Sequence, residues 1–186
     1  SSFVQPWFIA PVVRAGATLG SLVLREQARM LQGCNARECV RIATLAGLKV
    51  LRLTDSSPPE YRFEVDMGEP ILERSRIAFK PSSGPDSLIA FPLPVGGEVH
   101  SVTVSSMGNP HCSLFVNQFS DVDWEHLGNQ IESHPFFPER TNIEFIRVRG
   151  RNEIEVRFWE RGVGKTFSSG TGSCAAIVAS ILNDRT

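Results

Sequence analysis

Residues 154–182 constrain the fold more than any other stretch, because they read as a strand, a loop of small residues and a helix. Apolar and polar residues alternate over 154–159, the period of a half-buried strand. The run CAAIVASIL at 174–182 is long enough for a buried helix. Between them, the glycines of SSGTG at 168–172 let a ligand approach the backbone closely. Because a helix start carries unpaired N–H groups, we expect residues 170–172 to cap this helix and hold an anion. The alternative is an ordinary strand–turn–helix junction.

The same stretch contains GVGKT, which resembles the end of a phosphate-binding P-loop. That motif needs a glycine five residues before Gly164, and the chain has Trp159 there. The dinucleotide-binding pattern also fails, because Phe167 occupies the place of its third glycine. Both nucleotide-binding interpretations are therefore rejected.

Composition excludes several classes of partner. The chain has 186 residues and is 41% hydrophobic, which is enough to form the core of one large or two small domains. Its net charge of −1 lacks the charge excess that is typical of proteins that bind nucleic acid or a membrane surface. No apolar run approaches the roughly 18 residues of a membrane-spanning helix. The four cysteines (Cys34, Cys39, Cys112 and Cys174) lack the paired spacing of a zinc site. We expect a soluble, cytoplasmic protein without a metal.

Periodicity and turn residues predict most of the other elements. Residues 80–87, KPSSGPDS, are rich in Pro, Ser and Gly and indicate a linker or an exposed loop. Gly150-Arg151-Asn152 is expected to turn a hairpin. The predicted helices are 21–31 and 124–134, and the predicted strands lie within 48–55, 61–68, 100–106, 112–117 and 142–159.

Three further stretches contain candidates for chemistry. Asn109, between two predicted strands, offers a donor and an acceptor suited to an amino-acid ligand; its alternative role is that of an ordinary turn residue. His111 by itself is better explained as a hydrogen-bonded structural histidine than as a base. Asn142 begins a strand after charged residues. Glu160 and Arg161 follow a strand, where they form either a clamp for a zwitterion or a surface ion pair.

The order and spacing of these pieces resemble the diaminopimelate epimerase family of cofactor-independent amino-acid epimerases. The matching segments are MGNPHCSLFV (107–116), FPERTNIEFI (137–146) and VRFWERGVGKTFSSGTGSCAA (156–176). The resemblance implies an α+β fold of two related halves, each a curved, mostly antiparallel sheet wrapped round a central helix. We expect the halves to be residues 1–78 and 79–186, incomplete at both ends.

The resemblance also implies a mechanism: two bases convert LL-diaminopimelate to meso-diaminopimelate, a step of lysine and peptidoglycan-precursor synthesis. One thiolate removes the α-proton and a thiol on the opposite face delivers one, without pyridoxal phosphate or any other cofactor. His111 and Glu160 would flank the reacting centre. The implied binding residues for the small-molecule amino acid are Asn109, Asn142, Glu160, Arg161, Gly170 and Thr171. A homodimer is possible under this resemblance but is not specified by it.

The chain departs from the family pattern at both catalytic motifs. Ser169 stands where the family's second catalytic cysteine opens Cys-Gly-Thr-Gly, and a hydroxyl is much harder to ionise than a thiol. The first motif is also incomplete: Cys34 is our candidate for its base, whereas an ungapped alignment places Gln32 there. Two functions therefore stay open. One is an active epimerase, or a sibling isomerase with different bases; the other is a catalytically impaired homologue that binds amino acids.

Overall fold

The computed structural model describes residues 8–9, 39–44, 47–57, 60–65 and 67–186. The chain divides into two compact units, an N-terminal unit of residues 1–68 and a C-terminal unit of residues 69–186. This division falls earlier than the expected boundary between residues 78 and 79. Within the described ranges, no helix is both long enough and apolar enough to cross a membrane.

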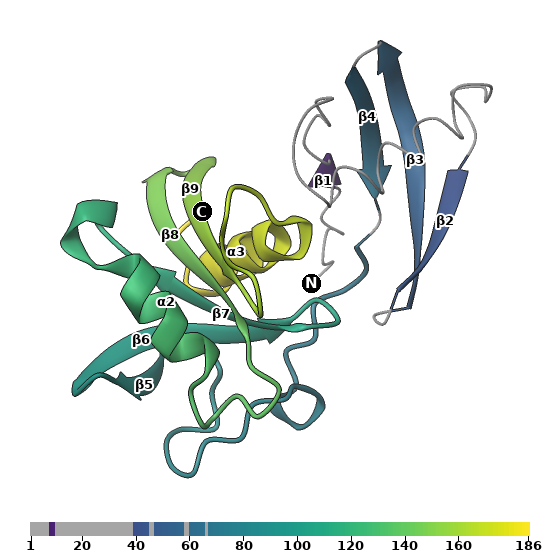
Figure 1. The fold of residues 1–186 in the computed structure, drawn as a ribbon. Coiled ribbons are helices and arrows are strands. Elements are labelled where there is room, and N and C mark those ends of the chain that lie inside the picture. Colours follow the sequence, from purple (N-terminus) through teal and green to yellow (C-terminus); the bar gives the residue numbers. More distant parts are fainter. Residues whose placement is uncertain (1–7, 10–38, 45–46, 58–59, 66) are drawn as a thin grey trace. The chain divides into compact units, whose positions relative to one another are not determined.

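The N-terminal unit contains an antiparallel sheet with the strand order β1-β4-β3-β2 (Figure 1). The two strands expected within 48–55 and 61–68 are present, and they pair antiparallel with Ser57 opposite Glu60. The strands are β1 (Phe8–Ile9), β2 (Cys39–Thr44), β3 (Gly47–Ser57) and β4 (Glu60–Val65). The expected helix at 21–31 lies outside the described residues.

The C-terminal unit is built on a mixed six-stranded sheet with the order β10-β9-β8-β7-β6-β5. β7 and β8 run parallel, and the other neighbouring strands of this sheet run antiparallel. The expected hairpin is confirmed, with its turn at residues 151–152. The strands are β5 (Phe91–Val95), β6 (Glu98–Ser106), β7 (Pro110–Phe115), β8 (Asn142–Gly150), β9 (Glu153–Glu160) and β10 (Gly164–Thr166).

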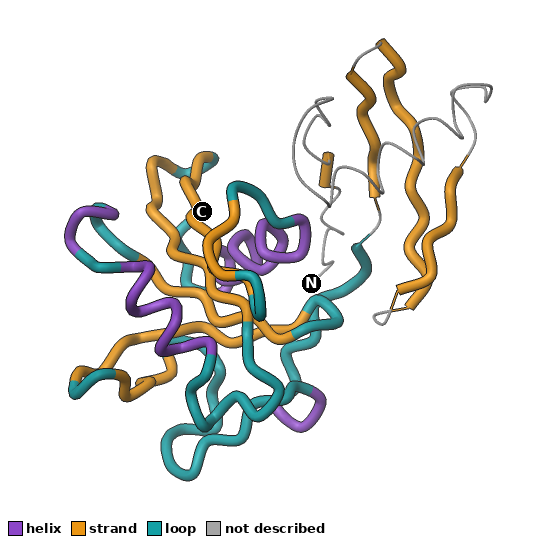
Figure 2. Tube along the Cα trace, viewed as in Figure 1, coloured by secondary structure: helices purple, strands orange, loops and turns teal. Residues whose placement is uncertain are grey.

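Two α-helices pack on this sheet, and Figure 2 shows the strands of the unit running between them. α2 (Trp124–Glu132) joins the parallel pair β7 and β8, and Asp123 caps its start by accepting a hydrogen bond from the amide of His126. α3 (Gly170–Leu182) follows β10 and contacts β6 to β9. Both confirm the helices expected from the sequence. Two short 3-10 turns, η1 (Arg74–Arg76) and η2 (Phe119–Asp121), complete the unit.

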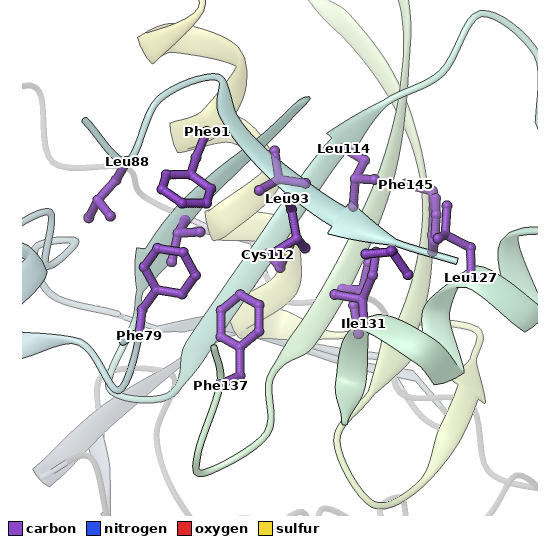
Figure 3. Close-up of a cluster of buried hydrophobic side chains, with 14 of the residues drawn as sticks. Phe79, Leu88, Phe91, Leu93, Cys112, Leu114, Leu127, Ile131, Phe137 and Phe145 are labelled. Atoms are coloured by element: carbon purple, nitrogen blue, oxygen red, sulfur yellow. The ribbon is translucent and has the colours of Figure 1, made fainter. Parts of the chain in front are cut away.

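The two faces of the sheet differ in chemistry because successive side chains of a strand point to opposite sides. One face is apolar and packs against α2 and against the segment before β5, forming the main core (Figure 3). Its strand residues are Val102, Val104, Cys112, Leu114, Ile143 and Phe145. The alternating residues on the other face are largely polar and buried: Thr103, Ser105, His111, Ser113, Asn142 and Glu144.

α3 covers the polar face, which explains its unusual composition. Its buried positions are small, and Ala176 and Ala179 form a minor apolar cluster with Ile146 of β8. At its C-terminal end, Asn183 donates a hydrogen bond to Thr103 of β6. Its N-terminal end lies over the remaining buried polar side chains, and the candidate site is built there.

The segment 80–87 is largely exposed, as expected, but it does not link the two units. It lies within the C-terminal unit, where Phe79 and Leu88 on either side are buried in the main core. Phe79 packs edge-on against Phe91, with ring centroids 5.0 Å apart. A loop whose two ends are anchored in one core cannot separate two domains, so the linker alternative for this segment is wrong.

Candidate functional site

Ser169 caps α3. Its backbone is extended (φ −144°, ψ 125°), and its hydroxyl accepts a hydrogen bond from the amide of Gly172 at 3.2 Å. The expectation that residues 170–172 themselves cap the helix is therefore wrong: a serine hydroxyl supplies the acceptor that glycine lacks. Gly170 and Thr171 form the first turn, where a helix provides no backbone acceptor for its amides. Anion binding by these two amides stays a prediction.

Glu160, the last residue of β9, reaches the same point from the sheet. The Ser169 hydroxyl donates a hydrogen bond to Oε2 of Glu160 at 3.4 Å while it accepts the one from Gly172. The serine oxygen thus lies between a carboxylate and a helix N-terminus. A hydroxyl held in this way is oriented as a donor toward the carboxylate, and it carries no thiol-like acidity.

Arg161 is held by residues at the start of β8 and just before it. Its amide donates to Oδ1 of Asn142 at 2.9 Å, and its guanidinium donates to the carbonyl of Glu139 at 2.9 Å. Asn142 is 6% exposed and also donates to the carbonyl of Pro110 at 3.4 Å. Gly162 follows with φ +75°, a conformation that favours glycine and turns the chain into β10. The segments around residues 139–142 and 160–162, which are far apart in sequence, therefore contact each other through Asn142.

Asn109 connects the turn before β7 to the start of α3. Its Nδ2 lies 3.5 Å from the hydroxyl of Thr171, and its Oδ1 lies 3.0 Å from Nε2 of His111. His111 is completely buried, and its Nδ1 lies 2.6 Å from Oε1 of Glu144. Both ring nitrogens of His111 thus have protein partners, as in a structural histidine. Its assignment to the reacting centre stays a prediction.

Glu144 was missed in the sequence, although it lies two residues after Asn142 on the same strand and so on the same face. Its carboxylate is 1% exposed, and it also accepts a hydrogen bond from the hydroxyl of Ser113 at 3.0 Å. Burial, together with the charge of Glu144, raises the pKa of the neighbouring Cys112 thiol well above its usual value. Cys112 lies on the opposite, apolar face of the sheet and is not part of the site.

Glu132, at the end of α2, is a second buried carboxylate that the sequence did not indicate. It accepts hydrogen bonds from the indole of Trp159 at 2.8 Å and from the amide of Gly162 at 2.8 Å, and it pairs with Arg140 at 3.2 Å. These bonds anchor β9 and the turn after it to the helix. Burial opposes ionisation, but the hydrogen bonds and the charge of Arg140 outweigh it and lower the pKa of Glu132.

The structure thus brings together eight of the nine candidate residues, all in the C-terminal unit. The ninth, Cys34, lies outside the described residues, as does its alternative Gln32. Cys174 is fully buried within α3 and does not replace the missing thiol at position 169. Among the residues whose placement is described, no group of three or more His, Cys, Asp or Glu side chains is arranged to hold a metal ion.

Comparison with known proteins gives the family of the segment that contains this site. Residues 103–186 match the family model described as diaminopimelate epimerase. This part of the chain belongs to the diaminopimelate epimerase family. The matched segment begins in β6 and contains all eight residues that the structure brings together.

Curated diaminopimelate epimerases extend the similarity beyond this segment. The protein from Pelotomaculum thermopropionicum is 47% identical over 148 residues, 79% of this chain and 52% of the relative. Those from Cyanothece sp. and Desulfitobacterium hafniense are 46% and 41% identical, over 77% and 83% of this chain and 50% and 54% of the relatives. The chain therefore spans about half the length of the curated relatives it matches.

Proposed function

We propose that the C-terminal unit binds the amino-acid end of diaminopimelate at the start of α3, within an isomerase of the diaminopimelate epimerase type. The observation that carries this proposal is the continuous set of contacts among the candidate residues. Asn109 contacts Thr171, Asn142 holds Arg161, and Glu160 contacts Ser169. Segments up to 62 residues apart in sequence thereby converge on one helix N-terminus.

The chemistry of these groups suits a zwitterion. The first-turn amides of α3 and the Arg161 guanidinium favour a carboxylate. The carboxylate of Glu160 favours an ammonium group. The same amides would stabilise the negative charge that develops on the substrate carboxylate as the α-proton leaves. We assign binding in this unit to the six residues named above: Asn109, Asn142, Glu160, Arg161, Gly170 and Thr171.

Position 169 lacks a side chain suited to proton transfer. In a two-base epimerisation one group removes the α-proton while a group on the other face returns one, so both must change protonation near neutral pH. The alcohol of Ser169 does not meet this requirement, and the buried thiols of Cys112 and Cys174 lie elsewhere. We therefore propose that the wild type exchanges the α-proton of one stereoisomer at most, with Cys34 as the candidate base.

A catalytically impaired, amino-acid-binding homologue is the second candidate function. The hydroxyl of Ser169 favours it, because this group serves as a helix cap and a donor to Glu160. Under this alternative, the substrate-binding groups are retained and no α-proton is removed. Both candidate functions share the expectation, implied by the family, that no pyridoxal cofactor is needed. Both also share the expected cytoplasmic location, and neither specifies an oligomeric state.

The decisive experiment compares wild type with Ser169→Cys in deuterated buffer. Incorporation of deuterium at the α-carbon of LL- and meso-diaminopimelate is followed by NMR. We expect one-sided or no exchange in the wild type and a gain of about 10²–10⁴-fold in epimerisation for Ser169→Cys, the range of one general acid–base group. Full epimerisation by the wild type would contradict the claim that Ser169 limits proton transfer. No exchange by either protein, with diaminopimelate still bound, would support the impaired homologue.

A further inference from the structure

A buried chain of polar side chains runs from the sheet to the start of α3. Glu144 on β8 contacts Nδ1 of His111 on β7, Nε2 of His111 contacts Oδ1 of Asn109, and Nδ2 of Asn109 contacts the hydroxyl of Thr171. Its inner members are sealed from solvent, with His111 at 0% and Glu144 at 1% exposure. Asn109 and Thr171, at its outer end, are half-buried.

The Asn109 amide restricts where the His111 ring carries hydrogen. An amide oxygen only accepts hydrogen bonds, so Nε2 of His111 must carry a hydrogen to bond Oδ1 at 3.0 Å. The 2.6 Å contact on the other side of the ring then contains one further hydrogen between Nδ1 and the Glu144 carboxyl. Such a short contact is typical of a charge-assisted hydrogen bond. The ring is thereby clamped at both nitrogens.

We propose that Glu144 is a positioning residue of the site. It fixes the His111 ring with a hydrogen on Nε2, and the ring in turn fixes the Asn109 amide with its oxygen inward and its NH₂ group toward Thr171. Without Glu144 the ring loses its anchor at Nδ1, and Asn109 is able to turn over and present its oxygen instead. Asn109 would then offer an acceptor where the site needs a donor.

The surroundings of Glu144 support this role. The hydroxyl of Ser113 donates to its second oxygen, so the carboxyl is held at both oxygens. Gly172 in α3 leaves room for it: a Cβ added there would lie 3.1 Å from Oε1 of Glu144 and 3.0 Å from the Ser169 hydroxyl. A fully buried carboxyl placed this close to the first turn of a helix is stabilised by the positive end of the helix dipole.

The consequence for the ligand rests on the proposed function. An NH₂ group directed toward the first turn of α3 adds a donor to the amides of Gly170 and Thr171, all suited to one carboxylate. Glu144 touches no substrate in this account. It acts through His111 and Asn109 to make the site select a carboxylate rather than a donor group.

NMR of the ligand-free full-length chain tests the inference without reference to activity. In the wild type, Nε2 of His111 should resonate as a protonated ring nitrogen. Glu144→Gln keeps the packing, and its carboxamide should donate to Nδ1, so Nδ1 loses its hydrogen while Nε2 keeps one. Glu144→Ala should also move the Asn109 side-chain amide resonances. The matched control, Glu132→Gln, alters another buried carboxylate that does not contact His111, and it should leave these resonances unchanged.

Two outcomes would overturn the proposal. An unprotonated Nε2 in the wild type would mean that the Asn109 amide is turned the other way. Unchanged Asn109 resonances when Glu144→Ala moves those of His111 would mean that the ring does not transmit its orientation. If Glu144→Ala fails to fold, Glu144→Leu, which fills the space but offers no partner to Nδ1, decides the question in the same way.

A double-mutant cycle on diaminopimelate binding extends the test to the ligand. We expect Glu144→Gln, which still anchors the ring, to bind like the wild type, and Glu144→Ala to weaken binding about two- to tenfold, the effect of one hydrogen bond. Glu144→Ala should have no further effect in an Asn109→Ala background, because coupled residues are non-additive. Additive effects would show that Glu144 does not act through Asn109. A wild type that binds no diaminopimelate would refute the proposed function instead, while the ring-nitrogen NMR would still decide the role of Glu144.

Discussion

Replacing Glu132 by glutamine should loosen the turn that carries Glu160 and Arg161. Each oxygen of Glu132 accepts one half-buried hydrogen bond, from the indole N–H of Trp159 or from the amide of Gly162. Glutamine retains one acceptor and places an NH₂ group against the other donor. The hydrogen bond from one of these donors to a charged oxygen is then lost, which costs about 1.5–3 kcal/mol. The pair with Arg140 adds little, because the arginine side chain is 61% exposed.

The cost should depend on pH with a definite sign. The pKa of Glu132 is lowered in the folded protein, despite burial, by its hydrogen bonds and by Arg140. The carboxylate therefore contributes stability above its unfolded pKa of about 4.3, and this contribution is lost as pH falls through the folded pKa. The difference between wild type and Glu132→Gln should be largest near neutral pH and should shrink in acid.

Urea unfolding at several pH values from neutral to acid, with hydrogen exchange at the Gly162 amide, measures both effects. Glu125→Gln is the matched control, because Glu125 lies on the same helix and pairs with Lys165 at the surface, where each side chain is 49% exposed. The control should change the free energy of unfolding by less than about 1 kcal/mol. A Glu132→Gln variant as stable as the control, or a difference independent of pH, would refute the reasoning.

Substitutions at three further positions test how α2 and α3 are held. Gly128→Ala should lower the melting temperature despite the higher helix propensity of alanine, because its Cβ would lie 2.9 Å from Cγ of Trp159; an increase would refute this close packing. Gly172→Ala should cost about 1–3 kcal/mol in urea unfolding, since its Cβ would lie 2.9 Å from Phe158; no loss would mean that the helix start adapts freely. Ser169→Ala should cost about 0.5–2 kcal/mol by removing the cap, whereas Ser169→Thr, which keeps a hydroxyl, should lose less.

The sequence predicted both α-helices and the strands β6 to β9 of the C-terminal unit, because their periods are unambiguous, but it did not predict β5 or β10. The alternation over 142–159 and the run of small apolar residues in α3 each allow one assignment. The cap of α3 was misassigned because serine and glycine are both favoured at helix starts, and only the position of the first helical residue separates their roles. The segment 80–87 has the composition of a linker, but its flanking apolar residues belong to one core.

The carboxylates that support the site were not predictable in the same way. His111 and Glu144 are 33 residues apart, and Trp159 and Glu132 are 27 apart. Their pairing depends on which strands are neighbours and on where α2 ends, and no local pattern encodes either. A glutamate between Ile143 and Phe145 did indicate a polar position on the face opposite the core, which is the one signal that pointed to Glu144.

Binding of LL-diaminopimelate, measured by calorimetry for wild type and Arg161→Ala, tests the central claim most directly. Arg149→Ala is the matched control, because Arg149 lies on the hairpin and pairs at 3.8 Å with the surface residue Glu155. The account predicts that the wild type binds, that Arg161→Ala weakens binding by more than the ~1 kcal/mol of a surface pair, about fivefold, and that Arg149→Ala leaves it unchanged. Equal affinity of wild type and Arg161→Ala, or no binding by the wild type, would contradict it.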